Sequence, residues 1–286
     1  MKKLFLMVLA ALSFCFSTIM AQNSITYVKK GSGQPVIFLP ALGCKGSVWD
    51  NTVNKLSKKY CCYEISIAGF GGVQLKGYFS MERISKDIIG LIKLKKLEYP
   101  VLIGHSVSGF LALKIASENP GIFSNLIIVD SFSFVFGSIY PSVTDEQAKA
   151  QAALLKNMIL KESDEQFKIS EEKNLVNLVS NKKDMDTVLS WVMSSNRNAI
   201  AEATYEMAAN DLRDGLKNIN CKTLIIGTWR GKEKFGYTKA STEKIFNEQY
   251  KNLKNKKIII SDNSKHFIML DNPGWLNKQI TRFISE

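Results

Sequence analysis

The chain has 286 residues, of which 45% are hydrophobic and 22% charged, and its formal net charge is +12. This composition is ordinary for a globular protein. The lysines that produce the charge are scattered and no nucleic-acid-binding module accompanies them, so we predict a solvated lysine-rich surface and no nucleic-acid partner.

The first residues have the layout of a secretory signal peptide. Lys2 and Lys3 precede an apolar run from Leu4 to Met20, and Ala21 stands directly before Gln22. We predict that residues 1–21 are removed by cleavage after Ala21. The protein would then be exported, either periplasmic or secreted, with no stable membrane insertion.

Two alternatives for this segment stay open. A lipoprotein signal would end at Cys15, although the bulky Phe14 precedes that cysteine. An uncleaved anchor would have to cross the membrane with 17 apolar residues, which is at the short limit for a span. Cleavage leaves 265 residues, a length that suits one large domain with an insertion better than two independent domains.

After Gln22, short apolar runs alternate with helical stretches, which predicts an α/β fold with a mostly parallel twisted sheet flanked by helices. The near-continuous Val, Ile and Leu content of the apolar runs is typical of strands buried on both faces. The predicted strands are Val36–Leu39, Cys61–Ile67, Tyr99–Ile103, Leu126–Val129, Thr223–Ile226 and Lys257–Ile260. Between them, Ser80 to Leu94 has helical periodicity, and Ser80 can serve as its N-cap.

The alternation stops after Asp130. From about Pro141 to Ile219 the chain has helical character and no convincing strand. We therefore predict that residues 132–219 form a helical cap, or lid, inserted into a core made of residues 22–131 and 220–286. Such an insertion would lie at the carboxyl edge of the sheet, where ligands bind in open α/β sheets.

Cysteine usage gives no disulfide framework. Export permits disulfides, but two of the cysteines are adjacent within a predicted strand, so we expect buried free thiols. The cysteines that remain after cleavage are Cys44, Cys61, Cys62 and Cys221.

The strongest chemical signal is the segment from Gly104 to Gly109, Gly-His-Ser-Val-Ser-Gly, which lies between a predicted strand and a predicted helix. A tight strand-to-helix turn that exposes Ser106 needs small residues on either side, because the serine adopts strained backbone angles. This segment resembles the nucleophile elbow of the α/β-hydrolase superfamily, and the resemblance covers nearly all of the mature chain. The usual pattern is G-x-S-x-G, whereas Ser108 stands here at the fifth position.

The resemblance implies a capped, esterase- or lipase-like bacterial hydrolase with Ser106 as its nucleophile. A serine hydroxyl needs a base, and the chain has two histidines. His105 is fixed beside Ser106, and we expect its side chain to point away from the serine. His266 follows the last predicted strand, where the superfamily places its catalytic histidine.

The sequence offers more than one carboxylate as the acid. Most relatives carry it after the penultimate strand, where this chain has Arg230, although Glu233 follows three residues later. A minority place it at the end of the strand after the nucleophile, and that position is Asp130. We therefore predict Asp130 as the acid that orients His266, with Glu233 as the alternative and Asp262 as a poorer one.

The resemblance also implies two backbone donors for the oxyanion, the N–H groups of Val107 and Leu42. Pro40 and Ala41 replace the His-Gly of relatives, but a backbone donor does not depend on those side chains. We predict a serine hydrolase of esters or lactones that acts on a small-molecule ester or acyl substrate through an acyl-enzyme. We expect no cofactor and no metal, because two histidines are too few for an ordinary metal site.

Two other functions stay open. The same triad performs C–C and amide-bond hydrolysis. Alternatively, the chain is a weakly catalytic ligand-binding protein on a hydrolase scaffold, a hypothesis that the missing acid after the penultimate strand supports.

Overall fold

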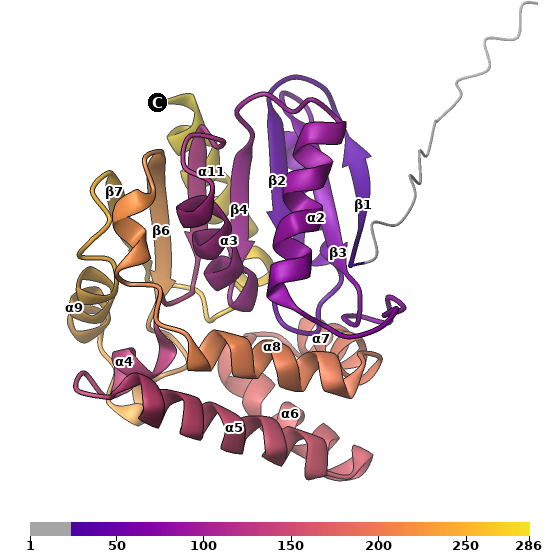
Figure 1. Cartoon of the computed structure of the whole chain (residues 1–286), viewed down its shortest axis with the longest axis vertical. Coiled ribbons are helices and arrows are strands. Elements are labelled where there is room, and N and C mark those ends of the chain that lie inside the picture. Colours follow the sequence, from indigo (N-terminus) through magenta and orange to yellow (C-terminus); the bar gives the residue numbers. More distant parts are fainter. Residues whose placement is uncertain (1–23) are drawn as a thin grey trace, which may run out of the picture.

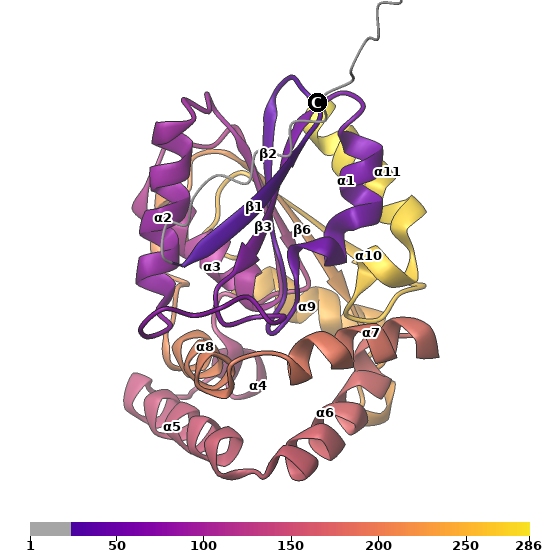
Figure 2. The same cartoon turned by 90° about the vertical axis from the view of Figure 1, so that its right-hand side faces the viewer.

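The computed structural model describes residues 24–286, whose strands form one seven-stranded sheet with helices on both faces (Figures 1 and 2). The predicted signal peptide, residues 1–21, lies outside the described residues. The strand order is β1-β3-β2-β4-β5-β6-β7. Strand β1 pairs antiparallel with β3, and every other neighbouring pair is parallel. The predicted mostly parallel sheet is therefore confirmed.

The strands form where the sequence has short apolar runs. Strands β4 and β5 are buried at every residue, because helices cover both faces of the sheet at its centre. The bounds are β1 Ile25–Lys30, β2 Pro35–Leu39, β3 Cys61–Ile67, β4 Val101–His105, β5 Asn125–Val129, β6 Lys222–Thr228 and β7 Lys256–Ser261.

Two features of the sheet differ from the prediction. Strand β1 was not expected, because only its first residue, Ile25, is buried and an edge strand needs no continuous apolar run. Strand β4 begins at Val101 rather than Tyr99. Tyr99 has a φ angle of 43° and lies in the preceding turn, in a conformation that a strand cannot contain.

Helices α2 and α3 lie on one face of the sheet, and helices α1 and α11 lie on the other (Figure 2). Helix α2 begins as predicted, since the Ser80 side chain accepts a hydrogen bond from the Arg83 N–H. The bounds outside the segment between β5 and β6 are α1 Asp50–Leu56, α2 Met81–Leu94, α3 Val107–Glu118, α9 Lys239–Gln249, α10 Ile268–Asp271 and α11 Pro273–Ser285. Single turns of 3-10 helix span Gly46–Trp49, Gly215–Asn218 and Glu233–Phe235.

Between β5 and β6 the chain forms five helices, which together we call the helical insertion, residues 135–209. Capping boxes at Thr144 and Ser163 fix where α5 and α6 begin, because each side chain satisfies a free backbone N–H of its helix. The helices are α4 Val135–Ile139, α5 Asp145–Lys161, α6 Asp164–Leu178, α7 Lys182–Met193 and α8 Arg197–Ala209.

The helical insertion lies at one end of the sheet (Figures 1 and 2). A Cβ atom added to Gly43, after β2, would lie 3.0 Å from Val192. A Cβ atom added to Gly69, after β3, would lie 2.6 Å from Ala199. The insertion therefore packs directly on the loops at the carboxyl ends of these strands. The division of the chain into core and cap stays a prediction.

The four cysteines within residues 24–286 carry free thiols. Three of them are buried, and Cys221 is only half-buried, because it precedes β6 at the end of the sheet opposite the insertion. Across the same residues, no helix combines the length and the apolar content that a membrane crossing requires.

Candidate active site

Ser106 occupies a strained turn between β4 and α3. Its φ and ψ angles are 56° and −126°, a combination that an L-residue adopts only where its surroundings impose it. Its N–H donates to the Val129 carbonyl of β5 at 3.0 Å, which extends the sheet by one residue. The strand and helix then hold Ser106 at the carboxyl edge of the sheet.

Close packing around this turn explains which positions must be small. A Cβ atom added to Gly104 would lie 2.2 Å from the Ser108 carbonyl oxygen, and one added to Gly109 would lie 2.6 Å from the Ser131 Cβ atom. The elbow thus needs glycine at 104 and 109. Ser108 replaces the glycine of the usual pattern without preventing the turn, and it is buried.

His266 and Asp130 form the central polar contact of the site. Asp130 follows β5, and His266 lies in the loop between β7 and α10. The distance from His266 Nδ1 to Asp130 Oδ2 is 2.6 Å. With Nδ1 donating its proton to the carboxylate, Nε2 is left as the acceptor nitrogen that a general base requires.

Backbone contacts aim the Asp130 carboxylate at this position. Its N–H donates to the Ile226 carbonyl at 2.7 Å, and its φ angle of 39° turns the chain away from the strand direction. Its Oδ1 atom accepts a hydrogen bond of 3.1 Å from the Thr228 N–H. The end of β6 therefore holds one carboxylate oxygen while the other receives His266.

Lys232 is a second partner of Asp130 that the sequence reasoning missed. Its ammonium nitrogen lies 3.5 Å from Asp130 Oδ2. Burial by itself would raise the pKa of Asp130, but Lys232 and the hydrogen bond from His266 outweigh it and lower the pKa to about 2. The carboxylate is consequently charged throughout the neutral range. Lys232 lies two residues beyond Arg230, in the loop where most relatives carry their acid.

His105 also belongs to the site, although the sequence suggested only that it points away from Ser106. It is fully buried, and its ring centroid lies 4.5 Å from that of His266. Burial, and then the neighbouring His266 ring, lower the pKa of His105 well below its ordinary value, so the ring is neutral. Its Nε2–H donates to the His266 carbonyl oxygen at 3.0 Å. His105 thus supports the backbone that carries the predicted base.

Other contacts hold the loop around His266. The Thr228 hydroxyl donates to the Ser264 carbonyl, and the Lys265 N–H donates to Asp271 at 2.7 Å. The Phe267 N–H donates to the Leu178 carbonyl, at the end of α6, at 3.1 Å. This loop is therefore tied to both the sheet and the helical insertion.

Several hydrogen-bonding groups of the site have no protein partner among residues 24–286. They are the Ser106 hydroxyl, His266 Nε2, the backbone N–H groups of Leu42 and Val107, and His105 Nδ1. Ser106 and His266 are therefore not hydrogen-bonded to each other. Val107 is the first residue of α3, whose leading N–H groups lack intrahelical acceptors. The N–H groups of Leu42 and Val107 are unoccupied within the described part of the chain, as oxyanion donors must be before substrate enters.

The two other carboxylates considered from the sequence bind different cations. Glu233 pairs with Arg230 at 3.1 Å, and Asp262 pairs with Lys239 at 2.8 Å. Both are about half-exposed, whereas the Asp130 side chain is 2% exposed. Of the three carboxylates, Asp130 is the one that bonds to His266.

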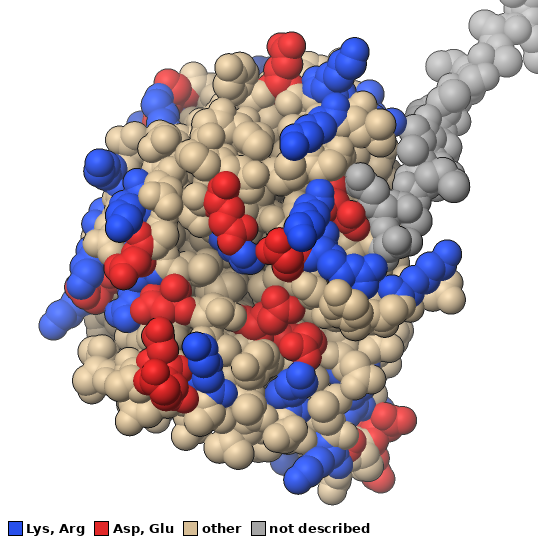
Figure 3. Space-filling view, viewed as in Figure 1, with Lys and Arg blue, Asp and Glu red and all other residues tan. Residues whose placement is uncertain are grey.

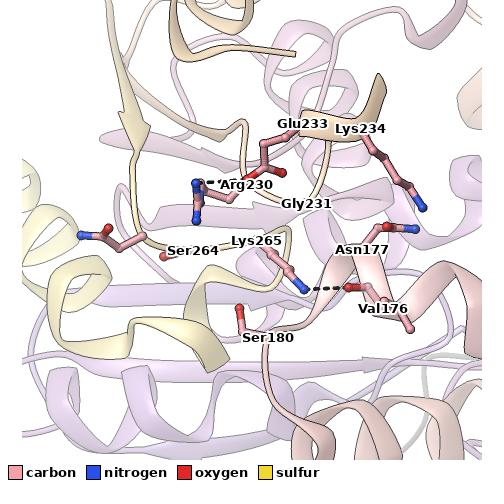
Figure 4. Close-up of a pocket in the computed structure, with 10 residues that line it drawn as sticks. Val176, Asn177, Ser180, Arg230, Gly231, Glu233, Lys234, Ser264 and Lys265 are labelled. Atoms are coloured by element: carbon pink, nitrogen blue, oxygen red, sulfur yellow. Dashed lines mark hydrogen bonds and ion pairs between the residues drawn. The ribbon is translucent and has the colours of Figure 1, made fainter. Parts of the chain in front are cut away.

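Glu233 instead lines a surface cavity of about 530 Å³ between the end of α6 and the loops after β6 and β7 (Figure 4). The cations around this cavity are largely engaged. Arg230 binds Glu233, and the Lys265 ammonium donates to the Val176 carbonyl at 2.7 Å. Lys234 also lines the cavity, and its ammonium lies 5.0 Å from the Phe235 ring centroid without a carboxylate partner among residues 24–286.

Charge is dispersed over the face of the molecule that Figure 3 shows. Lys and Arg side chains intermix with Asp and Glu side chains in Figure 3, so the net positive charge forms no continuous patch there. No three His, Cys, Asp or Glu side chains converge within residues 24–286 in a way that would hold a metal ion.

Comparisons with known proteins show likeness to hydrolases. No protein-family model matches the chain. It is 27% identical over 109 residues to a pimeloyl-[acyl-carrier protein] methyl ester esterase of Aliivibrio fischeri, a match that covers 38% of this chain and 41% of that protein. The chain thus matches about two fifths of the length of this curated relative.

Two solved structures match nearly the whole chain. A hydrolase from Pseudomonas aeruginosa has a TM-score of 0.77 at 15% identity, covering 96% of this chain and 100% of that one. An esterase from Exiguobacterium antarcticum has a TM-score of 0.74 at 18% identity, covering 92% of this chain and 96% of that one. These matches show that the chain has the α/β-hydrolase fold.

Proposed function

We propose that this protein is a serine hydrolase of carboxylic esters, including lactones, with Ser106 as nucleophile, His266 as base and Asp130 as the orienting acid. The observation that carries the proposal is the 2.6 Å contact between His266 Nδ1 and Asp130 Oδ2, at the same edge of the sheet as the strained Ser106. Asp130 would supply the acid that the sequence lacks at the usual position. The similarity to a curated esterase and to an esterase structure supports ester hydrolysis in general.

The reaction would begin when His266 Nε2 takes the proton of the Ser106 hydroxyl as its oxygen bonds to the acyl carbon. The N–H groups of Leu42 and Val107 would stabilise the oxyanion. Asp130 would stabilise the imidazolium that forms. His266 would then give its proton to the departing alkoxide as the ester C–O bond breaks.

The acyl-enzyme would be hydrolysed by the same groups in reverse roles. His266 takes a proton from water as the water oxygen bonds to the acyl carbon, and it returns that proton to Ser106 as the acyl–serine bond breaks. The products are a carboxylic acid and an alcohol, or one hydroxy acid from a lactone.

The ligand-binding hypothesis drew its support from the missing acid after the penultimate strand. Since Asp130 bonds to His266 from the neighbouring strand, that support is lost and we favour an enzyme. C–C or amide-bond hydrolysis would use the same three residues, and no observation favours either over ester hydrolysis.

Two measurements test the proposal. Purified wild type should hydrolyse short p-nitrophenyl esters and should be labelled by a fluorophosphonate, whereas Ser106→Ala should do neither while retaining its thermal unfolding temperature. Ser117→Ala is the matched control, since this serine lies on the same helix and bonds only to the Lys114 carbonyl. Labelling of Ser106→Ala at the wild-type rate would refute the assignment.

A further inference from the structure

The segment that links α7 to α8 contacts the loops after β2 and β3. The Asn196 N–H donates to the Gly69 carbonyl at 2.8 Å. The Ser195 hydroxyl accepts a hydrogen bond from the Gly71 N–H at 2.8 Å and lies 3.2 Å from the Gly43 carbonyl oxygen. The helical insertion is therefore hydrogen-bonded to both loops through consecutive residues.

Gly43 belongs to the turn that presents the Leu42 N–H. The turn is closed by a 3.1 Å bond from the Cys44 N–H to the Ala41 carbonyl. Its third residue, Gly43, has a φ angle of 67°, which favours glycine. The N–H group of the peptide between Gly43 and Cys44 is consequently held by a hydrogen bond within the turn.

The carbonyl side of that same peptide is fixed from outside the turn. The Gly43 oxygen accepts from the Gly71 N–H at 3.1 Å and faces the Ser195 hydroxyl. That hydroxyl also lies 2.9 Å from the Trp191 carbonyl in the last turn of α7, so its single proton is shared between two acceptors. Ser195 thereby joins the end of α7 to the turn that contains Leu42.

We propose that Ser195 is a positioning residue for the Leu42 N–H in ester hydrolysis, and that the helical insertion acts on the oxyanion site through it. This inference rests on the proposed function. An oxyanion donor stabilises the transition state only when it is held in place before charge develops. Loss of the Ser195 hydroxyl would leave the Gly43 oxygen with the Gly71 N–H as its single partner within residues 24–286, and that N–H would itself lose its 2.8 Å bond to Ser195. The turn would then be held less firmly.

Adjacent Ser194 provides a matched control. Its hydroxyl likewise donates to the Trp191 carbonyl, at 2.8 Å, but it is exposed and makes no bond to Gly43 or Gly71. Ser194→Ala thus removes a serine from the same helix end without touching the turn.

The experiment compares Ser195→Ala, Ser195→Thr and Ser194→Ala by steady-state hydrolysis of a p-nitrophenyl ester. Removing one oxyanion donor outright costs about 100- to 1000-fold in kcat, so a loosened donor should cost about 10- to 100-fold in Ser195→Ala, with KM within about twofold. Ser195→Thr keeps the hydroxyl and should stay within about threefold of wild type, as should Ser194→Ala. Phosphonylation by a fluorophosphonate should slow in parallel with kcat.

The outcomes separate this inference from the proposed function. If wild type is inactive towards every ester and is not labelled, the proposed function fails. If wild type is active but Ser195→Ala matches Ser194→Ala in kcat, or if its loss appears in KM alone, the role of Ser195 is wrong. Equal thermal unfolding temperatures for the two alanine variants are the check that a loss of kcat does not come from unfolding.

Discussion

Lys232 and His266 share one oxygen of Asp130: the lysine ammonium lies 3.5 Å from Oδ2, and the imidazole Nδ1 lies 2.6 Å from the same atom. The carboxylate is buried, so it would be costly to keep charged without these two partners. Their combined effect lowers the pKa of Asp130 to about 2.

This lowered pKa predicts an acid-dependent loss of stability. Between about pH 4 and pH 2 the unfolded chain binds a proton at Asp130 that the folded protein does not, so the free energy of unfolding falls as pH falls. The contribution is about 2 kcal/mol. Urea unfolding of Asp130→Asn and Lys232→Met between pH 5 and pH 2 should show a shallower decline than wild type. Lys234→Met, in the same loop, should decline like wild type, and a wild-type slope in Lys232→Met would contradict the ion pair.

Replacement of Asp130 should remove most of the activity. Asp130→Asn keeps the shape but cannot stabilise the imidazolium and favours the wrong tautomer of His266, a change that costs about 10⁴-fold in kcat in other triads. Glu233→Gln and Asp262→Asn should retain kcat within about twofold, because both carboxylates bind other cations. The measurement is kcat of the three variants and wild type in steady-state hydrolysis of one p-nitrophenyl ester. A larger loss in Glu233→Gln than in Asp130→Asn would transfer the role to Glu233.

His105→Phe should destabilise the protein in a pH-dependent way. The variant leaves the His266 carbonyl without its donor, at a cost of about 1–3 kcal/mol at pH 8. In the folded state His105 is neutral, whereas in the unfolded chain it has the ordinary histidine pKa of about 6.5. The free energy of unfolding of wild type therefore falls as pH falls below about 6.5. The variant has no histidine at this position, so it does not show this decrease. The difference between the two should therefore narrow from pH 8 to pH 5.

Chemical denaturation at several pH values measures this difference. His105→Gln carries an amide donor of similar reach and should recover part of the stability at pH 8. A constant difference between wild type and His105→Phe across the pH range would show that the ring is not kept neutral by burial.

Glu64 should make the protein less stable as pH rises, which is the opposite of the effect of Asp130 and His105. Burial, and then the nearby Asp50 carboxyl, raise the pKa of Glu64 to about 7. Between about pH 4.3 and pH 7 the folded protein binds a proton that the unfolded chain releases, so stability falls as pH rises through this window. Glu64→Gln should remove that decline and be the more stable protein above pH 7. Thermal unfolding between pH 5 and pH 8 tests this prediction, with Glu98→Gln, in an exposed loop, as the control.

Export predicts a defined mature terminus. Expression of the full chain in a bacterial host should give a periplasmic or secreted protein whose first residue is Gln22, because cleavage follows Ala21 in the signal-peptide layout. N-terminal sequencing of the fractionated protein measures this. Ala21→Pro is the matched variant and should accumulate unprocessed. Recovery of intact Met1–Ala21 in the mature protein would rule out cleavage.

Local sequence patterns were sufficient to predict much of the fold. The run from Cys61 to Ile67 is a strand with those bounds, and Ser80 caps the helix that follows it in the chain. Such patterns succeed because a doubly covered strand or an amphipathic helix must carry its apolar residues in a fixed order. The edge strand β1 was not predicted, because an edge strand does not need a continuous run of apolar residues.

The candidate site was only partly predictable. Ser106 and His266 stand in recognisable surroundings, and Asp130 could be proposed because it ends a strand. Lys232, His105 and Ser195 could not be assigned, because no motif in the sequence links them to the atoms that they bind, which lie 102, 161 and 152 residues away in the chain. The sequence by itself determined which groups have the required chemistry. Only the tertiary structure decided which of them meet, because hydrogen bonds between distant segments depend on how β5, β6 and the helical insertion pack together.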